Sequence, residues 1–282
     1  MEKISAINNI INGFVWGPYM LVLLIGTGVY MSIRTYFFQV KNFNIWAKLT
    51  YGSMFDKHEK GHNITPFQAV SVALASTIGI GSIAGIATAI VSGGPGALFW
   101  MVVSAFFGMM TKFSEVVLSV YFREKDEKGI HYGGPMYYIE KGLKQKWLSI
   151  LFAIFASIAT FGAGNMTQSN AIAGLLNQTL KLPEYVSGII VAIIVALVLI
   201  GGIKRISSVS EKLVPFMATI YFIASIIILI INFKNIPQAI KLIVSEAFSL
   251  KSAASGITGY AIFIAMRYGI ARGVFSNEAG LG

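Results

Sequence analysis

Long apolar stretches separated by short polar connections dominate the sequence. A helix of about twenty residues crosses the roughly 30 Å hydrocarbon core of a bilayer at about 1.5 Å per residue. The pattern predicts seven membrane-spanning runs, at residues 13–32, 66–91, 97–121, 147–176, 185–202, 213–231 and 253–282. We therefore expect an all-α polytopic membrane protein. The first run lacks a small-residue cleavage site after it, so we interpret it as a retained helix.

The composition agrees with a membrane environment. Apolar residues make up 55% of the chain and charged residues only 12%, with a mean hydropathy of +0.71, whereas soluble domains carry about 25% charged residues. The net charge of +10 comes from Lys and Arg in the connections between the runs. This distribution predicts a lipid bilayer as partner rather than nucleic acid. The positive-inside rule places the N-terminus outside a multi-pass plasma-membrane protein. With no cysteine, the chain forms no disulfide.

The stretch STIGIGSIAG, residues 76–85, has three interpretations. Its G-x-G-x-x-A pattern is typical of a dinucleotide-binding turn, but that fold needs an acidic residue about twenty positions later. The next acid after Gly85 is Glu115, and apolar runs lie on both sides, so this interpretation is disfavoured. Close helix packing through Gly81, Gly85 and Ala89 and a break in the membrane helix both stay open.

Two later runs are also unusually polar. Residues 160–170, TFGAGNMTQSN, place Asn165, Gln168 and Ser169 on one side of a regular α-helix, facing either a cavity or a neighbouring helix. Residues 267–282, RYGIARGVFSNEAGLG, hold two arginines, a glutamate and four glycines. This segment predicts a second helix break in the opposite orientation, and paired breaks of this kind indicate the binding site of a secondary transporter. Arg272 could instead extend to the interface.

Three further local features are predicted. GGPMYYIEKGL, residues 133–143, favours a short interfacial helix that begins at Pro135, and residues 237–248 have a similar amphipathic pattern. Lys112 and Glu115 are three positions apart, which predicts an ion pair on one helix face, with a role in coupling as the alternative.

Several of these segments together resemble the alanine or glycine:cation symporter family. The resemblance rests on STIGIGSIAGIATAI, GGPMYYIEKGL, FGAGNMTQSN and above all YGIARGVFSNEAGLG, and it extends from about residue 65 to the last residue. It implies a leucine-transporter-like fold of two inverted five-helix repeats in one transport domain, residues 1–282. The extra N-terminal helix would be 13–32, the first repeat 66–231, and the first helix of an incomplete second repeat 253–282. The implied activity is uptake of alanine or glycine driven by sodium as coupling ion, without a cofactor.

The resemblance also implies site residues at the two breaks and on the fourth run. Substrate contacts are expected from Thr77, Gly79, Ile80, Gly81, Gln168 and Asn277. Cation contacts are expected from the backbone carbonyls of Ala75 and Ile78, which would hold Na⁺, and from Ser82 and Glu278. Many family members carry asparagine at the position of Ser82, and serine has a shorter reach.

Several other functions compete with symport. The family pattern continues with further helices beyond the last residue, so we expect this chain to be a partial product that does not transport alone. A sodium- or proton-coupled carrier of another small amino acid, a non-transporting membrane fragment or scaffold, and a channel are the alternatives. An enzyme is disfavoured, because the sequence has neither H-E-x-x-H nor G-x-S-x-G and no aspartate inside an apolar run.

Overall fold

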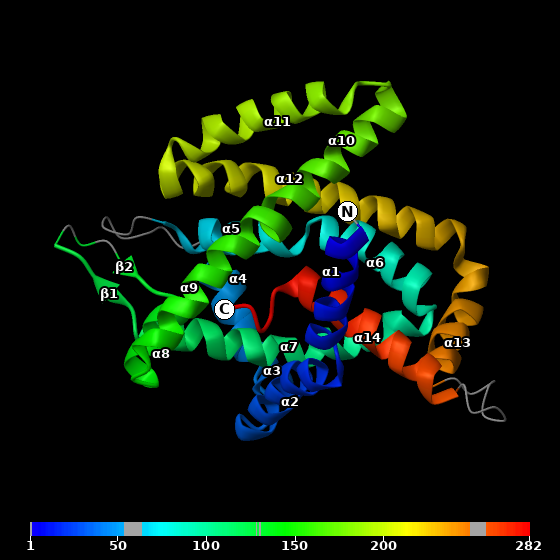
Figure 1. Ribbon diagram of the computed structural model, residues 1–282, viewed down its shortest axis with the longest axis horizontal. Helices are drawn as coiled ribbons and strands as arrows, with labels where there is room; N and C mark the ends of the chain where they lie inside the picture. The colour runs from blue at the N-terminus through cyan, green and yellow to red at the C-terminus, as the bar shows by residue number, and fades with distance from the viewer. Residues whose placement is uncertain (1, 54–63, 128, 130, 249–257) are drawn as a thin grey trace. The chain divides into compact units, whose positions relative to one another are not determined.

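The secondary structure is almost entirely helical. The computed structural model describes residues 2–53, 64–127, 129, 131–248 and 258–282 (Figure 1). Within these residues, the extended structure is one antiparallel pair of two-residue strands, β1 Glu124–Lys125 and β2 His131–Tyr132. The described part of the chain is therefore an all-helical protein, as the apolar pattern predicted.

Most helices are connected by turns of only a few residues. In chain order they are α1 Glu2–Val15, α2 Pro18–Arg34, α3 Phe38–Lys41, α4 Phe43–Ser53, α5 Pro66–Thr77, α6 Ile80–Gly93, α7 Gly96–Tyr121, α8 Pro135–Gly142, α9 Lys146–Ala159, α10 Thr167–Leu180, α11 Glu184–Leu199, α12 Gly202–Ile231, α13 Ile236–Ala247 and α14 Thr258–Asn277. A π-helical segment, Thr160–Met166, joins α9 to α10, and a 3₁₀ turn, Phe233–Asn235, precedes α13.

Five described segments are long and apolar enough to cross a membrane. They are Ala6–Arg34, Pro66–Gly93, Gly96–Tyr121, Lys146–Leu180 and Gly202–Ile231, and they correspond to five of the seven predicted runs. The predicted run 185–202 forms the shorter apolar helix α11. In the predicted run 253–282, residues 253–257 lie outside the described residues and the helix is α14. At most 22% of the residues in any of the five apolar windows are buried, which leaves large apolar surfaces for lipid.

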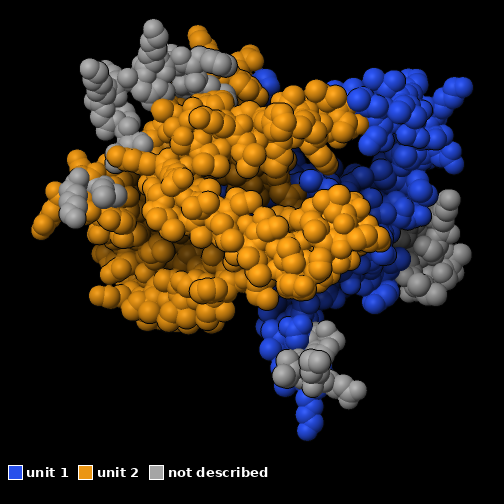
Figure 2. Space-filling model, turned by 90° about the horizontal axis from the view of Figure 1, so that it is seen from above, with its two compact units in different colours: residues 1–43, 81–117, 226–282 blue, residues 44–80, 118–225 orange. Residues whose placement is uncertain are grey.

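The chain forms two units, each built from separate segments of the sequence. Unit 1 contains residues 1–43, 81–117 and 226–282, and unit 2 contains residues 44–80 and 118–225 (Figure 2). The chain passes between the units inside the STIGIGSIAG segment, because Ile80 belongs to unit 2 and Gly81 to unit 1.

Unit 1 includes α14, which contacts α2, α6 and α7. Buried Leu21, Ile270 and Val274 form a small apolar cluster between α2 and α14. At the start of α7, a β-carbon on Gly96 would lie only 2.5 Å from the backbone nitrogen of Ala247, so only glycine fits against α13 at this point.

Unit 2 contains α5, α8 to α11 and most of α12. Helix α5 begins with a capping box, in which the Thr65 hydroxyl accepts from the Gln68 N–H and the Gln68 side chain accepts from the Thr65 N–H. The predicted short helix is confirmed as α8: Gly134 precedes it with φ 125°, and Pro135 is its first residue. The hydroxyl of Ser149 on α9 donates to the Met136 carbonyl at 2.8 Å, which ties α8 to α9.

Candidate functional site

The first predicted helix break is confirmed. Helix α5 ends at Thr77 and α6 begins at Ile80, with Ile78 at φ −91° and ψ 65° between them. The hydroxyls of Ser76 and Thr77 donate to the Ala73 carbonyl at 3.0 and 3.2 Å. Such side-chain bonds compete with helical ones, and Gly79 adds a weak helix former, so the interruption follows from the local sequence.

The break exposes the end groups of two helices. The first N–H groups of a helix and its last carbonyls have no partners within that helix, and the helix dipole makes the first end positive. The amides of Ile80 and Gly81 belong to the start of α6, and the carbonyls of Ala75 and Ile78 belong to the end of α5 and the residue after it. These backbone groups therefore have the polarity that a carboxylate and a cation require.

The same segment also packs tightly against another helix. Close helix packing, the other interpretation left open by the sequence, is therefore correct as well. Gly81, Gly85 and Ala89 are the buried residues of α6 and recur every four residues. A β-carbon on Gly81 would lie 3.0 Å from Cδ1 of Phe275, and one on Gly93 would lie 2.9 Å from Cβ of Tyr268. Gly81 at the start of α6 thus meets Phe275, and Gly93 at the end of α6 meets the earlier residue Tyr268. The two helices therefore run antiparallel.

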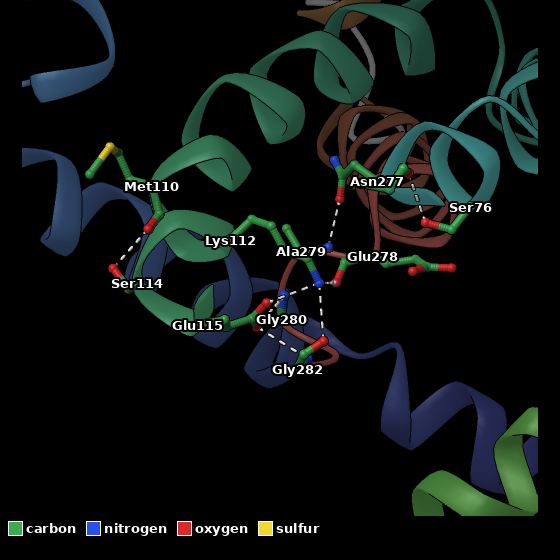
Figure 3. A network of polar contacts seen from close by, with 11 residues as sticks. Ser76, Met110, Lys112, Ser114, Glu115, Asn277, Glu278, Ala279, Gly280 and Gly282 are labelled. Atoms are coloured by element: carbon green, nitrogen blue, oxygen red, sulfur yellow. Dashed lines mark hydrogen bonds and ion pairs between the residues drawn. The ribbon is translucent and has the colours of Figure 1, made fainter. Parts of the chain in front are cut away.

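Helix α14 ends inside the segment for which the second break was predicted. The helix stops at Asn277, and Glu278 and Gly280 follow with φ 54° and 96°. The Asn277 side-chain oxygen accepts the Ala279 N–H at 2.9 Å (Figure 3). Asn277 thus uses its oxygen to stabilise the turn, as asparagine commonly does at such positions.

Lys112 and Glu115 on α7 hold the backbone beyond the end of α14. Their predicted ion pair is confirmed, with Nζ 3.4 Å from Oε2. In addition, Oε1 of Glu115 accepts the N–H groups of Gly280 and Gly282 at 2.8 and 3.3 Å, and Nζ of Lys112 donates to the carbonyls of Glu278 and Gly282 at 3.4 and 3.0 Å (Figure 3). The pair therefore provides hydrogen-bond partners for backbone groups that follow the end of the helix.

Helix α14 also lies directly on α7. A β-carbon on Gly269 would lie 2.3 Å from the Ala97 carbonyl oxygen, and one on Gly273 would lie 3.0 Å from the Ser104 hydroxyl. Residue numbers rise together along this contact, so α7 and α14 run parallel (Figure 1). Glycines four positions apart allow this close approach, as in other membrane helix pairs.

A hydroxyl pair joins α6 to α14 inside unit 1. The side chains of Ser82 on α6 and Ser276 on α14 are 2.5 Å apart and share a hydrogen bond. The start of α6 therefore lies beside the end of α14. Among the expected site residues, Gly81, Ser82, Asn277 and Glu278 are brought into this region of unit 1.

The remaining expected site residues belong to unit 2. Ala75, Thr77, Ile78, Gly79 and Ile80 follow one another through the first break. Gln168 is the second residue of α10 and is partly buried, and its side-chain oxygen accepts from the Thr167 hydroxyl at 2.6 Å.

The fourth run departs from a regular α-helix where its polar residues begin. Thr160–Met166 is π-helical, so the assumption of a regular α-helical rotation is wrong over these seven residues. Asn165 and Ser169 nevertheless lie on one side, because the Ser169 hydroxyl donates to the Asn165 oxygen at 3.3 Å. π-Helical turns inside membrane or soluble helices frequently occur at functional sites.

Side-chain clusters typical of a tightly held metal do not occur in the described part of the chain. No group of three or more His, Asp or Glu side chains is close enough there to hold an ion. The expected cation ligands are the backbone carbonyls of Ala75 and Ile78, the Ser82 hydroxyl and the Glu278 carboxylate, all of which are hard oxygen donors.

The comparison with known proteins decides the family. The model of the sodium:alanine symporter family matches residues 1–282. The chain belongs to this family of transporters. A sodium/alanine symporter of Methanococcus maripaludis, AgcS, is 45% identical over 286 residues, covering 100% of this chain and 62% of the relative. An uncharacterized transporter of Haemophilus influenzae is 43% identical over 281 residues, covering 99% of this chain and 61% of the relative.

Family membership and the long apolar helices both indicate that the chain is an integral membrane protein. The chain spans about three fifths of the length of these curated relatives. The amino-acid carrier protein AlsT of Bacillus subtilis is 36% identical over 278 residues, with 99% of this chain and 58% of the relative covered.

Proposed function

We propose that this chain belongs to a transport domain that carries alanine or glycine into the cell together with sodium. The observation that carries the proposal is the meeting of an interrupted helix with α14 in a chain of this family: Ser82, just after the break, bonds to Ser276, just before the position predicted for a second break. Paired interrupted helices are typical of secondary transporters, whose substrates bind at the breaks.

The antiparallel contact of α6 with α14 supports an inverted-repeat architecture. In a leucine-transporter-like arrangement, residues 66–231 are the first repeat and α14 is the first helix of the second. Corresponding helices of inverted repeats run in opposite directions, as α6 and α14 do. The domain lies in the plasma membrane with the N-terminus outside, an orientation supported by the distribution of Lys and Arg.

Each expected site residue has a proposed role that fits its chemistry. The amides of Ile80 and Gly81 bind the substrate carboxylate at the positive end of α6, with Thr77, Gly79, Gln168 and Asn277 as further substrate contacts. The carbonyls of Ala75 and Ile78 bind Na⁺, with Ser82 and Glu278 as additional oxygen donors. The Ser82 hydroxyl already bonds to Ser276, so a cation would share that oxygen.

The substrate is a small neutral amino acid. AgcS, the 45% identical relative, is named for sodium and alanine, and a Bacillus subtilis relative at 34% identity has a name that refers to sodium and glutamine. Competition by unlabelled glycine and glutamine against labelled alanine separates these substrates on the complete gene product.

Equilibrium binding of labelled alanine tests the proposal. We expect saturable binding to the purified complete gene product in sodium chloride and little binding in potassium chloride at the same ionic strength. Gln168→Ala should weaken binding about tenfold, the effect of removing one good hydrogen bond. Ser157→Ala is the control, because its hydroxyl bonds to the Ala153 carbonyl of its own helix.

Two results would contradict the proposal at different points. Alanine binding of equal affinity in sodium and potassium would remove the sodium coupling. Unchanged alanine affinity in Gln168→Ala would remove that residue from the site while leaving the transport function in place.

A further inference from the structure

A cavity in unit 1 lies beside the start of α6 and is not used by the proposed site. It has a volume of about 280 Å³ and is lined by Asn12 and Trp16 near the end of α1 and by residues of one α14 face: Arg267, Tyr268, Ala271, Arg272 and Phe275. Small-molecule sites begin at about 300 Å³, and one water occupies about 30 Å³. The cavity therefore has room for a small organic ligand.

Two guanidinium groups line the cavity without an acidic partner in the described part of the chain. Arg267 donates to the Asn12 carbonyl at 3.5 Å, and the described ion pairs involve only other residues. Both arginines are half-buried. Charged groups away from bulk water are costly unless paired, so the cavity carries an unbalanced positive charge that an anion would neutralise.

The other walls favour an anion with an apolar body. Trp16 and Phe275 offer apolar ring surface, and Tyr268 adds ring surface and a hydroxyl. Arginine presents donors in a planar fork that matches the two oxygens of a carboxylate. A carboxylate attached to a short aliphatic group satisfies both kinds of wall.

The position of the arginines along α14 argues against a lipid headgroup. In a helix of 20 residues, Arg267 is the tenth and Arg272 the fifteenth. At about 1.5 Å per residue, Arg267 lies about 14 Å from the start of α14, which the proposed fold places across the bilayer as the first helix of the second repeat. Lipid phosphates lie at the interface, far from this depth.

Phe275 connects the cavity with the first break. Its ring lines the cavity, and its Cδ1 would touch a β-carbon on Gly81 at 3.0 Å. A ligand in the cavity is therefore separated from the first turn of α6 by a single aromatic side chain. We propose that Arg267 and Arg272 form a carboxylate-binding subsite, next to the first break, which takes a small amino acid by its carboxylate. The choice of an amino acid and the depth of Arg267 in the bilayer rest on the proposed function.

Trp16 provides a direct signal for binding in this cavity. The difference in fluorescence between the protein and its Trp16→Phe variant isolates this side chain from all other tryptophans, three of which lie in this chain. We expect alanine and propionate to change the Trp16 signal in nanodiscs of phosphatidylcholine. Alaninamide, which lacks the carboxylate, should not.

The arginine variants test the assignment. Arg267→Gln and Arg272→Gln should each weaken propionate binding about tenfold, as expected for losing a hydrogen bond to a charged group. Arg→Lys at either position should weaken it less, because the charge remains while the fork is lost. Arg205→Gln, an exposed arginine in α12 outside the cavity, should leave binding unchanged.

Three results would overturn the subsite. They are the absence of a Trp16 response to propionate, a propionate affinity in both Arg→Gln variants equal to that of the unsubstituted protein, and a Trp16 response that appears only when phosphatidylglycerol is added. Alanine binding that needs sodium but ignores both arginines would leave the proposed function standing without the subsite. Propionate binding that needs the arginines, without any sodium-dependent alanine binding, would leave the subsite standing without the proposed function.

Discussion

Replacing Gly269 by alanine should separate α14 from α7. The added β-carbon would lie 2.3 Å from the Ala97 carbonyl oxygen and 2.9 Å from Cβ of Trp100. Neither atom is the end of a flexible side chain, so one helix must move by roughly 1 Å to restore ordinary contact distances. Overpacking of this kind costs up to about 3 kcal/mol. Alanine returns about 1 kcal/mol through its higher helix propensity, which leaves a net destabilisation of about 2 kcal/mol.

Gly174 in α10 is the matched control. It is also a helix-interior glycine, but a β-carbon there would meet no atom within 4 Å. Gly174→Ala should therefore stabilise the protein by up to about 1 kcal/mol. Unfolding titrations in mixed detergent micelles, followed by circular dichroism, should place the two variants about 3 kcal/mol apart. Equal stability of Gly269→Ala and Gly174→Ala would refute the close contact of α14 with α7.

Two further contacts can be tested independently. Glu115→Ala should speed deuterium exchange of the amides beyond the end of α14 about tenfold, because the carboxylate accepts two of those N–H groups; Glu124→Ala, in β1, should not, and equal exchange in both variants would contradict the contact. Ser82→Ala and Ser276→Ala should show a coupling of about 0.5–1.5 kcal/mol in a double-mutant cycle of stability; strictly additive effects would show that the two hydroxyls do not interact.

The interruption between α5 and α6 and the end of α14 could be predicted from the sequence because their causes are local. Gly79 and the hydroxyls of Ser76 and Thr77 weaken the helix within the segment that breaks. Asn277 and Gly280 favour turn conformations at the end of α14. Likewise, Gly134 followed by Pro135 was enough to predict the start of α8.

Other features depend on contacts that no sequence spacing reveals. The ion pair of Glu115 with Lys112 was predictable, because the two residues are three positions apart on one helix. The bonds of Glu115 to the N–H groups of Gly280 and Gly282 were not, because these residues are 165 and 167 positions away. The packing of the α14 glycines against α7 was not predicted, because these glycines were interpreted as part of a helix break and their spacing does not identify a neighbour. The π-helical segment Thr160–Met166 was missed, because residue identity signals polarity there but not the extra residue per turn.

Sodium-driven uptake tests the central claim most directly. The complete gene product is reconstituted in proteoliposomes, and labelled alanine is followed with sodium outside and potassium inside. We predict saturable accumulation above the outside concentration, which collapses when sodium is equal on both sides. Accumulation that is the same without a sodium gradient, or uptake that does not saturate with alanine, would contradict a sodium-coupled symporter.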